Sequence, residues 1–381
     1  MNKLKLAVIT GSRADYGLLR NTIKKAQLHK KINLSLIVTG THLSRKFGYS
    51  FRDIKKDKFK IHHKIYLNIN QNSDIGISNQ VASGIKLFSE LFKKKKFDLI
   101  LLLGDRYEIL SSAIASMIMK IPVAHIHGGE ITRGTMDEKI RHMISKISSI
   151  HFTATSLAKK RLHQMGENPN NVYNVGAPGI ENFKNTNLPN KIELYKKIKI
   201  PINSSFVLFC YHPNTLEGSK KNLKEIKIIC DAIKNCINKY CIITSPNSDA
   251  NSNLIINFLK KFSKSQKKFK FIKNLGTNYY FATLKKCDFI IGNSSSGIIE
   301  APYLKKQVLN LGDRQQGREM SNLITNMVID KDKICFALKK IKKIKNYKNI
   351  TIYYKYKKTS DIIIKTILKK KMNIKKIFYD F

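Results

Sequence analysis

The chain has 381 residues, of which 42% are hydrophobic, and it carries a formal net charge of +45. This length predicts two domains of about 150 to 200 residues, and the apolar fraction allows each to bury a core. Ten of the 71 basic residues are arginine, so 61 are lysine, and the lysines are spread along the whole chain. Because such a spread forms no basic patch, we do not expect nucleic-acid binding as the main function.

The cysteines and the apolar runs predict the compartment. None of the six cysteines forms a C-x-x-C pair and most lie in apolar segments, so we expect buried free thiols in a reducing cytoplasm. The first residues contain too short an apolar run for a signal peptide, and no segment reaches about 18 uncharged apolar residues. We therefore expect a cytoplasmic protein without a membrane segment.

Apolar runs that end in polar clusters alternate with helical patterns in the first half of the chain, which predicts a mostly parallel, doubly wound sheet. The expected first domain covers residues 1–179. Its strands are expected at 4–10, 34–38, 61–66, from Leu99, Pro122 and Ile150, and at 171–175, and its helices after 17 and at 79–95, 107–120, 137–146 and 156–165.

A polar stretch at about residues 180–205 predicts a linker, and a second series of the same kind follows within residues 180–381. Two doubly wound domains with a cleft between them form the α/β arrangement called GT-B, and the C-terminal helix could pack back on the first domain. Strands are expected at 206–210, 240–244, 269–273, 288–291 and 307–311, a helix at 223–237, and a helical tail from Lys331.

Charged clusters follow the apolar runs between residues 98 and 142. Asp105 comes directly after one run, His127 and Glu130 follow the next, and Asp137 lies in a third cluster. Because the carboxyl ends of parallel strands meet at one edge, we expect these side chains to converge on one crevice. Carboxylates and imidazoles suit proton abstraction from carbon, whereas a metal is not expected because no ligand spacing fixes one.

Residues 292–297, GNSSSG, follow an expected strand and precede an expected helix. Backbone N–H groups at such a helix start favour a diphosphate, although serine also caps ordinary helices. Glu300 could accept hydrogen bonds from a ribose or could be a solvated acid, and His212 ends the first strand of the second domain. The turn after the first strand matches neither a dinucleotide fingerprint nor a P-loop, which argues against both cofactor classes.

Several motifs together resemble the hydrolysing UDP-N-acetylglucosamine 2-epimerases of sialic-acid biosynthesis. The resemblance implies a GT-B fold, no cofactor, a homodimer or homotetramer, and a two-stage reaction. Anti elimination of UDP gives a 2-acetamidoglucal, and hydration then releases N-acetylmannosamine. The motifs are SRADYG at 12–17, LGDRYE at 103–108, HIHGGE at 125–130, DEKIRH at 137–142, ISK at 144–146, HP at 212–213, GNSSSGIIE at 292–300 and NLGDRQQGRE at 310–319.

The resemblance also implies roles for individual residues. Asp105 and Asp137 match catalytic acids of the family, and His212 matches a histidine near the leaving diphosphate. His127 stands where many members have a catalytic glutamate, so either His127 or Glu130 transfers the proton, or the substrate differs. Nucleotide-binding positions match Arg13, Arg106, Asn247, Ser294, Ser295, Glu300 and Arg314.

Four alternatives stay open at this point. The same reaction could act on a nucleotide-linked 2,4-diacetamido-trideoxy sugar of the legionaminic-acid type, carried by UDP or GDP. A non-hydrolysing epimerase and a GT-B glycosyltransferase share the expected fold. A basic nucleic-acid-binding protein is the candidate from a different class.

Overall fold

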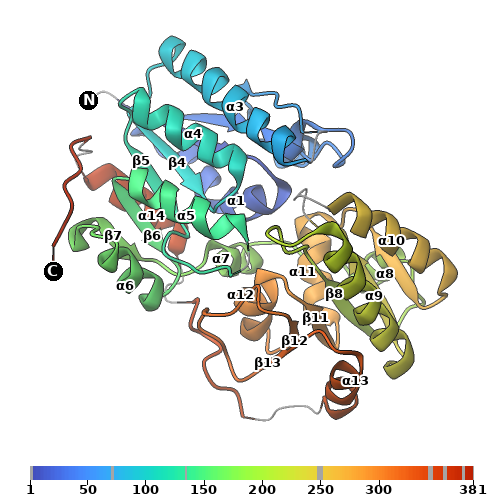
Figure 1. The fold of residues 1–381 in the computed structure, drawn as a ribbon. Coiled ribbons are helices and arrows are strands. Elements are labelled where there is room, and N and C mark those ends of the chain that lie inside the picture. The colour runs from blue at the N-terminus through green and yellow to red at the C-terminus, as the bar shows by residue number, and fades with distance from the viewer. Residues whose placement is uncertain are drawn as a thin grey trace. The chain divides into compact units, whose positions relative to one another are not determined.

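The computed structural model describes residues 3–69, 73–133, 135–246, 252–341, 346–354, 358–370 and 374–380. The chain divides into two compact units. Unit 1 comprises Met1–Glu130, Asp137–Lys184 and Tyr353–Phe381, and unit 2 comprises Ile131–Met136 and Asn185–Ile352. Each unit is built on one parallel β-sheet (Figure 1).

The sheet of unit 1 has seven strands in the order β3-β2-β1-β4-β5-β6-β7. Every pair is parallel, as the alternation of strands and helices predicts. The strands are β1 (Leu4–Thr10), β2 (Ile32–Val38), β3 (His63–Lys64), β4 (Leu99–Leu103), β5 (Val123–Ile126), β6 (Ile150–Thr153) and β7 (Val172–Asn174).

Helices cover both faces of this sheet because alternate strand residues point to opposite sides. Side chains such as Leu6 and Val8 form a core with helices α1 and α14, while α3 packs on α4, which packs on β4. Besides 3₁₀ turns at Gly40–Leu43 and Pro169–Asn171, the helices are α1 (Arg13–Leu28), α2 (Phe51–Lys56), α3 (Asp74–Lys94), α4 (Tyr107–Ile118), α5 (Met136–Ile147), α6 (Ser156–Gln164), α7 (Pro178–Lys184) and α14 (Thr359–Lys369).

Unit 2 repeats the architecture with six parallel strands in the order β10-β9-β8-β11-β12-β13. One core lies against α9, α10 and α13, and the other against α8, α11 and α12. The strands are β8 (Phe206–Cys210), β9 (Tyr240–Thr244), β10 (Phe269–Ile272), β11 (Phe289–Gly292), β12 (Gln307–Leu311) and β13 (Ile324–Met327), and the helices are α8 (Lys191–Ile198), α9 (Ser219–Cys236), α10 (Ser252–Ser265), α11 (Gly276–Lys286), α12 (Ser295–Tyr303) and α13 (Lys331–Lys340).

The two-sheet α/β class is confirmed, but several elements differ from the sequence predictions. The strand expected at 61–66 is reduced to the two residues of β3. The expected linker at 180–205 contains α8, whose first turn is fixed by a capping box between Asn190 and Glu193. Helices α2, α7, α10 and α11 and strand β13 were not predicted.

The two units do not divide at residue 179 alone, and the C-terminal helix lies in unit 1, where the sequence allowed it to pack back. Residues 180–184 remain in unit 1, because α7 packs on α1. Helix α14, coloured red in Figure 1, lies beside the strands of unit 1, where Ser360 donates to the Glu181 carboxylate at 2.5 Å. Residues 131–136 belong to unit 2, where Arg318 Nε donates to the Ile131 carbonyl at 2.9 Å.

The prediction that all six cysteines are free thiols is wrong for one pair. Cys236 and Cys335 form a disulfide across α9 and α13, which pack together and bring the two Cα atoms to 5.5 Å. The sequence separation of 99 residues leaves no local pattern from which this pair could be read. The other four cysteines are free and buried.

Among the described helices, none has both the length and the apolar character that crossing a membrane requires.

Candidate active site

A turn at the carboxyl end of β4 presents Asp105. The chain leaves the strand through Gly104, which adopts φ +81°, a conformation that glycine takes without steric cost. The Asp105 carboxylate pairs with the guanidinium of Arg141 on α5. Arg141 is buried and also donates to the Glu130 carbonyl at 2.8 Å, so it joins the turns that follow β4 and β5.

His127 and Glu130 form a second pair in the loop after β5. His127 Nδ1 lies 2.6 Å from Glu130 Oε1, and both residues are buried. Because a carboxylate only accepts, Nδ1 carries the hydrogen of this bond, and in the neutral ring Nε2 keeps its lone pair. His127 Nε2 is buried and has no hydrogen-bond partner among the described residues.

Asp137 lies in the first turn of α5, four residues before Arg141. That spacing puts both side chains on one side of the helix. Through Arg141, the structure therefore links Asp105 to the loop that holds Glu130 and His127, and it places Asp137 one turn away. These contacts bring Asp105 together with the loop of Glu130 and His127, whereas Asp137 is placed near them only by its position on α5.

Arg106 and the turn that precedes Arg13 share a buried acidic neighbour. Arg106 Nε donates to Glu108 Oε1 at 2.7 Å, and a Cβ on Gly11 would lie 2.5 Å from Glu108 Cγ. The Asp15 carboxylate accepts from Ser12 N at 3.0 Å and completes the capping box of α1, in which Ser12 is the N-cap. Burial raises the Asp15 pKa to about 6, although the Arg106 charge opposes that shift.

In unit 2, Asn293 organises the predicted nucleotide loop. Its side chain accepts from His212 N at 2.7 Å and donates to His212 O at 2.8 Å. Its carbonyl accepts from Gln315 Nε2 at 2.8 Å and from Arg314 at 3.4 Å. Ser294 follows as the N-cap of α12 and its side chain accepts from Ser296 N, so the positive end of this helix lies directly after Asn293.

Comparison with known proteins decides the family. The family model described as UDP-N-acetylglucosamine 2-epimerase matches residues 24–368. The chain belongs to the UDP-N-acetylglucosamine 2-epimerase family. It is therefore a nucleotide-sugar 2-epimerase, and the relatives that cover most of the chain include enzymes named as hydrolysing.

Three relatives illustrate the match. The chain is 38% identical to the GDP/UDP-N,N'-diacetylbacillosamine 2-epimerase (hydrolyzing) of Campylobacter jejuni, over 87% of this chain and 86% of that protein. It is 38% identical to polysialic acid biosynthesis protein P7 of Escherichia coli, over 87% and 84%. The UDP-N,N'-diacetylbacillosamine 2-epimerase (hydrolyzing) of Legionella pneumophila is 34% identical, over 88% of each chain.

Two solved structures share the fold. The UDP-GlcNAc 2-epimerase of Methanocaldococcus jannaschii in complex with UDP-GlcNAc and UDP matches with a TM-score of 0.80 at 22% identity, over 96% of this chain and 99% of that one. The Neisseria meningitidis UDP-GlcNAc 2-epimerase bound to UDP-GlcNAc matches with a TM-score of 0.77 at 20% identity, over 96% and 100%. Both support the expected GT-B class.

Sequence reasoning about this epimerase gave no role to two residues that hold the site together. Arg141 lies in the DEKIRH motif, where a rare arginine in a lysine-rich chain indicated a placed side chain but not its partner. Asn293 lies within GNSSSG, but nothing in the sequence indicated that its amide would hold the His212 backbone. The predicted binding residue Asn247 lies outside the described residues, and Glu300 is buried in α12.

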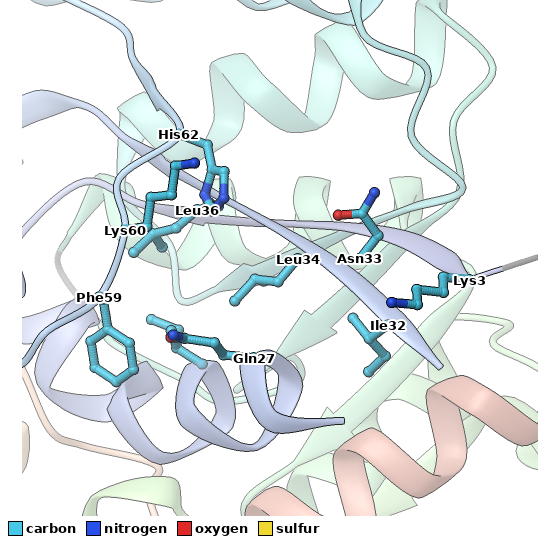
Figure 2. A pocket seen from close by; sticks show the side chains of 10 residues that line it. Lys3, Gln27, Ile32, Asn33, Leu34, Leu36, Phe59, Lys60 and His62 are labelled. Atoms are coloured by element: carbon cyan, nitrogen blue, oxygen red, sulfur yellow. The ribbon is translucent and has the colours of Figure 1, made fainter. Parts of the chain in front are cut away.

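A cavity of about 370 Å³ lies in unit 1 of this epimerase beside β2 (Figure 2). Strand β3 pairs only with Ile37 and Val38, so the first residues of β2 have no neighbouring strand on that side among the residues that the structure describes. At this point His62 Nδ1 accepts a hydrogen bond from the Leu36 N–H at 3.0 Å. None of the candidate site residues lines it. The lining residues are Lys3, Ile23, Gln27, Ile32, Asn33, Leu34, Leu36, Phe59, Lys60 and His62.

The described residues contain no group of three or more histidine, cysteine or acidic side chains arranged to hold a metal ion.

Replacing Gly292 by alanine is expected to destabilise unit 2 by at least about 3 kcal/mol. Gly292 adopts φ +130°, and a Cβ there would lie 1.9 Å from the Cys210 carbonyl oxygen, which is backbone and cannot turn away. Thermal unfolding measures the effect. Gly218→Ala is the control, because a Cβ at Gly218 meets nothing within 4 Å. An equal Tm for both variants would contradict the prediction.

Proposed function

We propose that this epimerase hydrolyses a UDP-linked 2-acetamido sugar to UDP and the free 2-epimer. The observation that carries the proposal is the connected cluster of unit 1. There Arg141 joins Asp105 to the loop of Glu130 and His127, and His127 Nε2 is buried with no hydrogen-bond partner in the described part of the chain. A buried base held by a carboxylate suits the removal of a proton from carbon.

The proposed reaction has two stages. A base removes the C2 proton, the C–H electron pair forms the C1–C2 double bond, and the bond from C1 to the UDP oxygen breaks. Water then adds its hydroxyl to C1 of the 2-acetamidoglucal. C2 receives a new proton on the face opposite to the one from which the first proton was removed, which inverts C2. We assign the proton transfers to His127, supported by Glu130, and to the acids Asp105 and Asp137.

Candidate residues for nucleotide binding occur in each of the two units. In unit 2 the N-terminus of α12 and the Arg314 guanidinium supply positive ends that stabilise a departing diphosphate, and His212 is held beside them by Asn293. We assign the remaining contacts to Arg13, Arg106, Asn247, Ser294, Ser295 and Glu300. A cytoplasmic location and a homodimer or homotetramer stay predictions.

The sugar is assigned first to N-acetylglucosamine, which the motifs imply. A second candidate is the N,N'-diacetylbacillosamine nucleotide, because two relatives, 38% and 34% identical to this chain, carry that sugar in their names. The two sugars differ at C4 and C6, away from the C2 proton and the C1 leaving group. The same catalytic cluster therefore serves either substrate.

Incubation with UDP-N-acetylglucosamine is expected to release UDP and free N-acetylmannosamine without added nicotinamide cofactor or metal. In D₂O the released sugar should carry one deuterium at C2, because the original proton is lost and replaced from solvent. Nuclear magnetic resonance of the products measures both the epimer and the label. The diacetamido nucleotide is assayed in parallel.

Each other outcome points to a different function. Turnover of the diacetamido nucleotide alone would select the second candidate. Intact UDP-N-acetylmannosamine would indicate the non-hydrolysing reaction, and UDP release that needs an acceptor sugar would indicate a glycosyltransferase. Salt-resistant, sequence-specific DNA binding without turnover would favour the nucleic-acid reading.

A further inference from the structure

His125 is buried between the turn that holds Asp105 and the helix α5 that holds Arg141. It lies on β5 between Ala124 and Ile126, which both point into the core that contains α1 and α14. Its own side chain therefore points to the opposite face of the sheet and is fully buried. There Nε2 lies 2.7 Å from the Gly104 carbonyl oxygen, and Nδ1 lies 3.1 Å from Ser145 Oγ on α5.

The chemistry of these partners fixes the tautomer of the ring. A carbonyl oxygen only accepts, so Nε2 carries the hydrogen and donates to Gly104. Burial lowers the His125 pKa to about 3, so the ring is neutral at physiological pH and Nδ1 has a lone pair. Ser145 Oγ–H therefore donates to Nδ1. The imidazole therefore bridges Gly104 and Ser145 through one donated and one accepted hydrogen bond. Its single N–H proton is used in the bond to Gly104, so the ring does not transfer a proton to the substrate.

The two groups that His125 joins flank the ion pair of the candidate active site. Gly104 is the residue directly before Asp105, and Ser145 lies one helical turn after Arg141. Asp105 and Arg141 pair with each other, so the ring links the same turn and the same helix at a second point. The ion pair and the His125 bridge together fix the Asp105 turn to α5 at two points. The second link therefore prevents the turn from rotating about the ion pair.

Gly128 leaves the space that this bridge needs. A Cβ at Gly128 would lie 2.8 Å from Ser145 Oγ and 3.1 Å from His125 Nδ1, so any side chain there would press on the hydrogen bond. The histidine, the serine and the glycine come from β5, α5 and the loop between them. His125 and Ser145 thus form the hydrogen bond, and the glycine at position 128 leaves room for it.

We propose that His125 is a positioning residue that holds the Asp105 turn and the Arg141 helix at the separation that the reaction requires. The inference rests on the proposed function for its effect on turnover. The bridge itself is independent of that function. His125 contacts neither substrate nor reacting atoms, because both ring nitrogens are engaged with Gly104 and Ser145.

His151 provides a matched control. It lies opposite His125 in the register of β5 and β6, and it is equally buried. Burial also lowers its pKa, but its Nε2 bonds to Glu167 Oε2 at 2.9 Å and not to the Asp105 turn. A variant of His151 therefore removes a buried imidazole of the same sheet without removing the bridge.

The test compares His125→Met, His125→Gln and His151→Met. Methionine removes both hydrogen bonds, whereas the glutamine amide can again donate to Gly104 and accept from Ser145. We expect His125→Met to lower kcat about 10²-fold with KM changed less than about twofold, since misplacement by about 1 Å has effects of this size. His125→Gln should recover part of kcat, and His151→Met should lower Tm while kcat stays near the wild-type value.

Amide hydrogen exchange provides the second readout, which needs no turnover. Residues 104–108 and 137–147 should exchange faster in His125→Met than in His125→Gln or His151→Met. Equal exchange in all three variants, or an equal loss of kcat in both methionine variants, would overturn the positioning role. If the wild type turns over neither nucleotide sugar, the proposed function fails, and the exchange data alone decide whether the bridge holds the turn.

Discussion

Replacing Asp105 by asparagine is expected to lower kcat about 10²- to 10⁴-fold, the range for losing a positioned acid or base. Asparagine keeps the shape of the side chain but removes the charge that pairs with Arg141. The asparagine oxygen can still accept a hydrogen bond from the Arg141 guanidinium, which also donates to the Glu130 carbonyl, so the change removes the carboxylate's charge and its ability to exchange a proton. The measurement is the initial rate of UDP release, with KM determined for the same variant.

Asp98→Asn is the matched control for this prediction. Asp98 lies just before the opposite end of β4 and accepts a hydrogen bond from the Lys5 N–H at 2.7 Å. The two variants make the same chemical change at the two ends of one strand. We expect Asp98→Asn to retain the wild-type kcat. An Asp105→Asn variant with normal turnover would rule out a catalytic role for this carboxylate.

The strands that carry the site could be predicted because their apolar runs are buried on both faces. Residues 206–210, 240–244 and 307–311 were expected as strands and agree with β8, β9 and β12. In unit 1 the runs expected from Leu99 and Pro122 form the neighbouring strands β4 and β5. A parallel sheet brings the carboxyl ends of such strands together, so the closeness of Asp105 to the loop of His127 and Glu130 followed from strand order alone. The pattern also placed Ser294 at a helix start, where it caps α12.

The remaining features depend on contacts between distant residues, which no local pattern records. The membership of residues 131–136 in unit 2 depends on bonds such as that from Arg318 to Ile131, 187 residues away. The disulfide between Cys236 and Cys335 depends on how α9 packs on α13. The pairing of Arg141 with Asp105 depends on which face of α5 meets the sheet.

Replacing His127 by glutamine is expected to lower kcat about 10²- to 10⁴-fold, because glutamine cannot take up the C2 proton. Glu130→Gln should lower kcat less, by about 10-fold to 10²-fold. The glutamine oxygen can still accept a hydrogen bond from His127 Nδ1 and hold the ring. The order of the two losses distinguishes the roles. If Glu130 were the group that takes the proton, Glu130→Gln would be the more damaging change.

His127→Glu sharpens the comparison, because glutamate and glutamine have the same shape and only glutamate can accept the proton. Both replacements adopt the left-handed backbone of His127, φ +68°, at a similar cost, so a difference in kcat between them reports proton transfer. We expect His127→Glu to exceed His127→Gln in kcat by at least about 10-fold. Equal rates for the pair would mean that position 127 shapes the site without exchanging a proton, and would leave Asp105 and Asp137 to move the proton at C2.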